Sequence, residues 1–127
     1  MFVDPLGASL KLYRFDASLA RPIEQYGSLG AGIVPLLKTN EALTVVCIRL
    51  DANGVLGRHP AIHNQLFLVV DGAGEVSGED MYSHPISAGQ AAFWRAGEMH
   101  ETRTRHGLTA IVIEGETVQP AAWMAAL

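Results

Sequence analysis

The sequence has little cysteine, little charge and no block of basic residues. Of its 127 residues only Cys47 is a cysteine, and charged residues make up 17% of the chain. A single cysteine excludes an internal disulfide framework and agrees with a reducing compartment. The net charge of −4 excludes the strongly basic surface on which most nucleic-acid binding depends. We therefore expect no nucleic acid among the partners of this protein.

Long hydrophobic runs are also missing. The longest apolar runs, 66–70 and 110–113, are far too short to cross a bilayer, so we expect no membrane partner. The N-terminal stretch lacks a cationic segment followed by an apolar one, so we expect no signal peptide and a cytoplasmic protein. Hydrophobic residues still make up 49% of the chain, which predicts one globular domain over residues 1–127.

What the sequence does contain is a succession of short apolar runs separated by glycines, of which there are 13. Strand-like runs at intervals of roughly ten residues predict an all-β sandwich or barrel. The expected strands cover 9–15, 30–38, 43–50, 65–70, 74–78, 91–94, 99–105 and 108–115. Asp71-Gly72 is a turn signal, so we expect the fourth and fifth of these strands to form a hairpin.

The tail alone favours a helix. Pro120 is suited to a first helical position, and Trp123 and Leu127 then lie one turn apart. We expect this short C-terminal helix to pack as a lid or against a partner and to carry no chemistry.

Two segments in the middle of the chain share a fixed spacing of polar residues and glycines. In the first, His59 and Gln65 precede an apolar run that ends at Gly72. In the second, GQAAFWRAGEMH at 89–100, two glycines stand at set distances before His100. Together these segments resemble the two motifs of the cupin superfamily over about 54–115. The resemblance implies a small single-domain cupin, which is a double-stranded β-helix or jelly-roll barrel and commonly a homodimer.

The resemblance also implies a divalent metal ion, which Zn, Fe, Mn or Ni could equally be. Neighbouring strands would bring His59, Gln65 and His100 to one interior point. Of the four metal ligands of a typical cupin, only the two histidines are retained, because Ala61 replaces a histidine and Gln65 replaces a glutamate. An amide oxygen neutralises none of the charge of the ion. We expect either weaker metal binding or a charge balance completed by an anionic substrate, hydroxide or a nearby acid.

His63 is a fourth candidate ligand. It shares the alternation of His59 and Gln65, so it could substitute for the histidine lost at position 61. It lies two residues further along, about 6–7 Å on an extended strand, and a loop or bulge after Pro60 would have to absorb that shift.

Alternation along the strands adds candidates for the cavity lining. Residues that share the parity of His100 or Gln65 are predicted to line it, namely Phe67, Val69, Thr102 and Thr104. Arg49 either anchors a substrate carboxylate in the barrel mouth or lies along the rim with its charge in water. His84 and His106 stand in turn-like stretches, so we expect both to face solvent.

Three functions are compatible with these features. The first is a metal-dependent enzyme acting on a small polar molecule by dioxygen insertion, isomerisation or lyase chemistry. The second is a non-catalytic binding or sensor module with weak or no metal, and the third is a structural barrel. A positioned acid or base beside the metal site would favour the enzyme, because the fold alone does not select a reaction.

Overall fold

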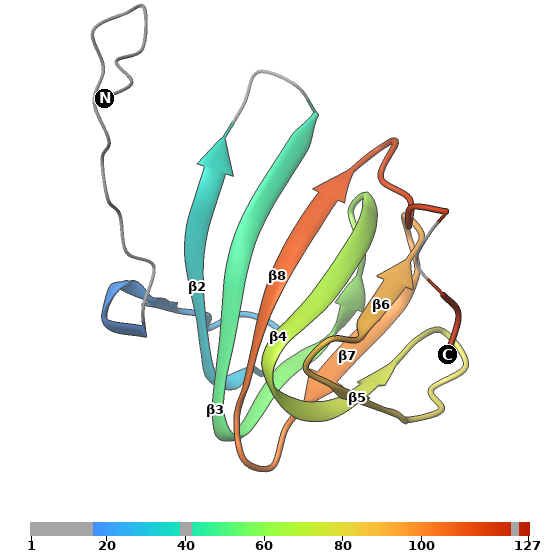
Figure 1. The fold of residues 1–127 in the computed structure, drawn as a ribbon. Coiled ribbons are helices and arrows are strands. Elements are labelled where there is room, and N and C mark those ends of the chain that lie inside the picture. Colours follow the sequence, from blue (N-terminus) through green and yellow to red (C-terminus); the bar gives the residue numbers. More distant parts are fainter. Residues whose placement is uncertain (1–16, 39–41, 123–124) are drawn as a thin grey trace, which may run out of the picture.

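The computed structural model describes residues 17–38, 42–122 and 125–127. A short 3₁₀ turn, η1 (Ala17–Leu19), precedes eight strands. The strands are β1 (Arg21–Pro22), β2 (Leu29–Lys38), β3 (Leu43–Pro60), β4 (Asn64–Ser77), β5 (His84–Ser87), β6 (Ala91–Trp94), β7 (Met99–Arg103) and β8 (Leu108–Gly115). The all-β barrel predicted from the strand spacing is thereby confirmed, and Figure 1 shows its strands wrapped around one interior.

Two long, bent strands close the barrel. The first half of β3, 43–50, pairs with β8, and its second half, 55–60, pairs with β7. Strand β4 does the same, pairing with β8 over 64–72 and with β7 over 75–77. The pairings β3–β8, β8–β4, β4–β7 and β7–β3 therefore form a closed circuit. Such closure removes exposed edges from the strands that take part in it.

The bend in β4 corrects the predicted hairpin. Asp71 and Gly72 do not reverse the chain, because β4 continues through them to Ser77. Gly72 adopts φ +78, and a β-carbon there would overlap the carbonyl oxygen of Gly107. The sequence signal therefore marked a position where the backbone needs a positive φ, but it did not mark a hairpin. The residues after it pair with β5 and β7 instead of folding back on 65–70.

The interior is filled by the side chains that point inward, which alternate along each strand with side chains that point outward. The largest fully buried side chains are Phe67, His100, Thr102 and Cys47. The apolar core cluster includes Ile48, Leu50, Phe67, Val69, Ile86, Trp94, Leu108, Ala110 and Val112. A buried histidine and threonine on β7 within this apolar set are unusual, since polar groups are expensive to bury.

The tail does not contain the predicted helix. Residues 116–122 form a turn and irregular chain, residues 125–127 are not helical, and Trp123 lies outside the described residues, as does the expected strand 9–15. After Gly115 the chain turns through a hydrogen bond from the Val118 amide to the Gly115 carbonyl, which ends β8 without starting a helix. Within the described part of the chain, no helix is long and apolar enough to cross a membrane.

The bend in β4 yields a stability prediction. Gly72→Ala should destabilise the fold by more than about 3 kcal/mol, because it adds a backbone overlap to the cost of a positive φ. Gly89 also has a positive φ, but a β-carbon there meets nothing within 4 Å. Gly89→Ala should therefore cost only about 1–2 kcal/mol. Urea unfolding of both variants checks the order, and equal losses would contradict the role given to the bend.

Candidate functional site

The two motif histidines meet inside the barrel. His59, at the end of β3, and His100, on β7, are paired across the two strands. Their ring centroids lie 4.4 Å apart with the planes inclined at 52°. Each ring donates its Nδ1–H to a backbone carbonyl, His59 to Gly57 at 2.6 Å and His100 to Glu98 at 3.2 Å. Because carbonyls can only accept, these bonds leave both Nε2 lone pairs available to a ligand.

His100 is held neutral. Its side chain is 2% exposed, and its Nε2 atom has no hydrogen-bond partner among the described residues. Burial lowers the pKa of His100 to about 4, the bond to the Glu98 carbonyl opposes this, and electrostatic interactions with His59 and Arg58 add to it. A neutral imidazole with an unused lone pair at pH 7 is the form that ligates metals or accepts a proton.

A carboxylate lies beside the predicted amide. Gln65 on β4 pairs with Glu114 on β8, and the Gln65 Nε2 atom donates a hydrogen bond to Glu114 Oε1 at 3.2 Å. Glu114 was missed by the sequence reasoning. Its signal was its alternation with Val112 and Ala110, which places it on the inner face of β8. The sequence expectation that a nearby acid could complete the charge balance thus has a specific candidate.

These four polar side chains line a cavity of about 460 Å³. Apolar lining comes from β2, β3, β4 and β8, through Ile33, Val46, Ile48, Leu56, Phe67 and Val112. The segment before β2 contributes five residues, Arg21, Pro22, Ile23, Gln25 and Tyr26, and four of them are exposed, which places this segment at the cavity mouth. A cavity lined by both polar and apolar side chains fits a small molecule that has polar and apolar parts.

Five rings form a column of successive contacts, and all but Trp94 line the cavity. Tyr26 stacks on His59 with centroids 4.0 Å apart, and His59 contacts His100. His100 in turn lies 4.6 Å from Trp94, which meets Phe67 edge-on at 5.8 Å. The column runs from Tyr26, 53% exposed, to Phe67, 1% exposed. The two imidazoles are therefore clamped between aromatic neighbours and have little freedom to rotate.

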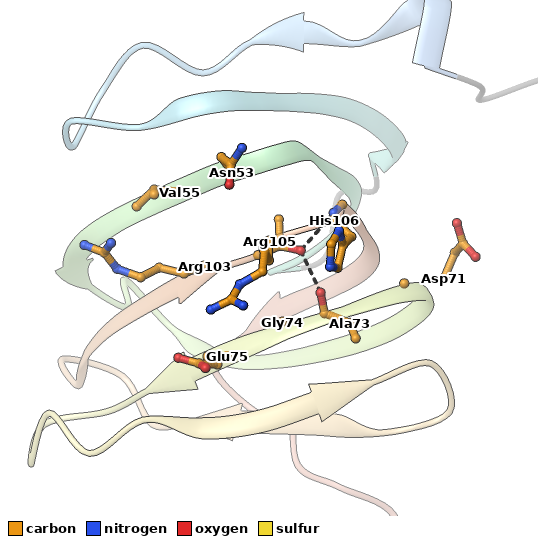
Figure 2. A pocket seen from close by; sticks show the side chains of 13 residues that line it. Asn53, Val55, Asp71, Ala73, Gly74, Glu75, Arg103, Arg105 and His106 are labelled. Carbon is orange, nitrogen blue, oxygen red and sulfur yellow. Dashed lines mark hydrogen bonds between the residues drawn. The ribbon is translucent and has the colours of Figure 1, made fainter.

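A second, larger hollow lies elsewhere on the described surface, with a volume of about 790 Å³. It is lined by residues of the bends in β3 and β4 and of the loop after β7, and Figure 2 shows their side chains. Arg103, Arg105 and His106 are exposed and lie between the lining residues of β3 and those of β4. The Thr104 hydroxyl donates a hydrogen bond to the Ala73 carbonyl at 2.6 Å, and both residues line this hollow. The described residues that line it include one histidine, His106, and no pair of imidazoles, so we assign the site to the smaller cavity.

Comparison with known proteins rests on solved structures. No family model matches the sequence, and no curated protein matches it. The polyketide cyclase RemF from Streptomyces resistomycificus superposes with a TM-score of 0.71 at 16% identity, over 87% of this chain and 83% of that one. A cupin 2 conserved barrel domain protein from Salinispora arenicola gives 0.70 at 12% identity, over 87% and 92%. A predicted oxalate decarboxylase from Thermotoga maritima gives 0.68 at 20% identity, over 76% and 91%.

The chain has the cupin fold. The expectation drawn from the two motifs is confirmed at this level. The position of the missing cupin histidine, Ala61, is 3% exposed. Its backbone links the two motifs, since the Ala61 amide donates to Glu98 and the Ala61 carbonyl accepts from Gly97.

The structure separates the predicted site residues of this barrel into two groups. His59, Gln65, His100 and Phe67 line the cavity, whereas His63, Val69, Thr102, Thr104 and Arg49 do not. His63 lies in the loop between β3 and β4, because β3 ends at Pro60 and the alternation stops there.

The other residues outside the lining have identifiable surroundings. Val69 belongs to the apolar core, and Thr102 is buried with no partner for its hydroxyl among the described residues. Thr104 lines the hollow of about 790 Å³. Arg49 donates to the Thr109 hydroxyl across the β3–β8 pair at 3.3 Å. His84 and His106 are exposed, as predicted.

The buried neutral state of His100 predicts a dependence of stability on pH. The native pKa of about 4 lies below the ordinary value of 6.5, so between these pH values the unfolded chain binds more protons. The free energy of unfolding should therefore fall as the pH drops from 6.5 to 4, by at most about 3 kcal/mol from this group.

Urea unfolding at pH 7 and pH 4.5 measures this loss. His100→Gln should flatten the dependence, and His106→Gln, a change at an exposed histidine, should leave it as in the wild type. A wild-type slope in His100→Gln would contradict the assignment to His100.

Proposed function

We propose that this cupin binds a divalent metal ion through His59 and His100, together with a small polar ligand in the cavity, and that it is an enzyme. The observation that carries the proposal is the state of the two imidazoles. Both Nδ1 atoms are bonded to backbone carbonyls, and the His100 Nε2 atom is buried without a partner among the described residues. Metal-ligating histidines are typically fixed in this way, with the second ring nitrogen bonded to a carbonyl or carboxylate.

The donor set supports a weakly held ion. Among the described residues no three His, Cys, Asp or Glu side chains are grouped closely enough to hold a metal by themselves. The two imidazoles would be the protein ligands, and Gln65 and the Glu114 carboxylate, which supplies negative charge, line the same cavity. When bound, a divalent ion in such a site acts as a Lewis acid that polarises a ligand oxygen.

The residues of the chain favour proton transfer among the reactions considered. Glu114 places a carboxylate in the cavity, where it can take a proton from a bound molecule. The Gln65 amide, which donates to Glu114 Oε1, holds that carboxylate in place. The apolar walls would orient the rest of the substrate and exclude water. These roles support an isomerase or lyase type of reaction on a small oxygen-bearing substrate.

The comparisons support an enzyme only by analogy of fold. One similar structure is that of a polyketide cyclase and another that of a predicted oxalate decarboxylase, so barrels of this shape hold catalytic sites. The cytoplasmic location and the homodimer expected from the sequence are part of the same proposal.

The alternative is a binding or sensor cupin without catalysis. It is favoured by the lack of a three-ligand group among the described residues and by the bond that occupies the Gln65 amide. In that case the cavity would hold its ligand through Gln65, Glu114 and the imidazoles, with weak or no metal.

Metal content tests the proposal directly. Protein purified from a metal-replete culture should carry about one divalent ion per chain, and His100→Ala should lose most of it, because one of two imidazole ligands is gone. His106→Ala is the matched control, since it removes an exposed histidine and should retain the ion. Elemental analysis makes the measurement. Wild-type protein free of metal would favour the alternative.

Moving the carboxylate tests the pair formed by Gln65 and Glu114. Gln65→Glu alone sets two carboxylates side by side, so it should tighten metal binding and destabilise the metal-free protein through like-charge repulsion. The double variant Gln65→Glu/Glu114→Gln keeps one carboxylate and one amide but exchanges their strands. If Gln65 contacts the ion, the exchange should tighten binding relative to the wild type, measured by competition with a Zn²⁺ indicator. Unchanged affinity in both variants would show that position 65 is not a ligand.

A further inference from the structure

The segment before β2 covers the mouth of the cavity. Residues 21–26 contribute five side chains to the cavity lining, and β1 anchors the segment by pairing with β2. The Ile23 amide donates to the Ala31 carbonyl, and the Ser28 amide closes a turn onto the Gln25 carbonyl. We call residues 21–28 the mouth segment. It is held at both ends while its turn faces the cavity.

Tyr26, in that turn, has a costly conformation and little burial. Its φ of +63 lies in the left-handed region, which side chains with a β-carbon avoid. Its side chain is 53% exposed, so burial in the core does not compensate for the strain. What the conformation achieves is a parallel stack on His59, with centroids 4.0 Å apart and planes inclined by only 7°. Strain of this kind marks a position whose geometry is used.

Gly57 joins the mouth segment to His59 through three contacts. Its amide donates to the Ser28 hydroxyl at 3.2 Å, and its carbonyl accepts from His59 Nδ1 at 2.6 Å. Its α-carbon faces the Tyr26 carbonyl so closely that an added β-carbon would overlap the Tyr26 backbone. One residue therefore holds the turn from one side and fixes the tautomer of His59 from the other.

We propose that Tyr26 is a positioning residue for His59, and that the mouth segment closes the cavity by seating its turn against Gly57. The stack prevents the His59 ring from rotating and keeps Nε2 directed into the cavity. A ligand then enters past Tyr26. The proposal rests on the proposed function only in treating His59 as a group that contacts the ligand, because the contacts themselves involve no metal.

The first experiment observes His59 without any metal. Protein labelled with ¹⁵N-histidine is studied by long-range ¹H–¹⁵N correlation, and His59→Gln identifies the His59 signals. Tyr26→Leu should shift the His59 ring protons downfield, since the ring current is lost, and should reduce the population protonated at Nδ1. Tyr26→Phe keeps a stacked ring and should restore the wild-type signals. Unchanged His59 signals in Tyr26→Leu would overturn the proposal.

The second experiment displaces the turn from the opposite side. Gly57→Ala should give the His59 shifts of Tyr26→Leu, and it should speed the entry of Zn²⁺, followed by stopped-flow indicator competition. Gly74→Ala is the matched control, because its β-carbon would overlap the Arg103 carbonyl in another part of the barrel. It should change neither readout. Equal His59 shifts in both glycine variants, or none in Gly57→Ala, would overturn the proposal. Failure of Zn²⁺ to bind the wild type would refute the metal site alone and leave the NMR result decisive.

Discussion

The closed circuit of β3, β8, β4 and β7 is the constraint on which the rest of the structure depends. Two strands are long enough to serve two neighbours each, and each must bend halfway to do so. The bends require a positive φ at Asn53 and Gly72 and close contact between backbones. In return the circuit brings the end of β3, the start of β4 and the inner face of β7 to one place. Residues far apart in the sequence become neighbours there only because the circuit closes.

The chemistry of the site follows from that convergence. Burial keeps His100 neutral, while backbone carbonyls fix the proton on Nδ1 in both rings. The Gln65 amide therefore plays a different chemical role from that of a carboxylate at the same position. It binds Glu114 through its amide and lets one negative charge stay in the cavity without a second beside it. The charge of this site is set by which side chains pair across neighbouring strands in the cavity. It cannot be read from the residue at one motif position.

Features with local causes could be predicted from the sequence, and features with distant causes could not. The resemblance to the two cupin motifs implied that His59, Gln65 and His100 face the interior, and all three line one cavity. The Asp71-Gly72 signal predicted a backbone requirement correctly but not the partner of the next residues, which is decided by β5 and β7. Glu114 was not predicted as a site residue because it becomes a neighbour of Gln65 only through the register between β4 and β8, which the sequence does not show.

Tyr26 and the tail show the same limit. The stack of Tyr26 on His59 depends on a slot at Gly57 that no periodicity reveals. The helix expected at the tail rested on local propensity alone, and a turn at Gly115–Val118 ends β8 instead.

The column of rings has an optical consequence. The indole of Trp94 is 4.6 Å from the imidazole of His100, inside a core where it is 4% exposed. A cation or proton that reaches His100 changes the electric field at that indole, and a buried indole has no solvent to average the change. We therefore expect the absorption and emission of Trp94 to change when the state of His100 changes. The protein carries its own chromophore in contact with one of the imidazoles that line the cavity.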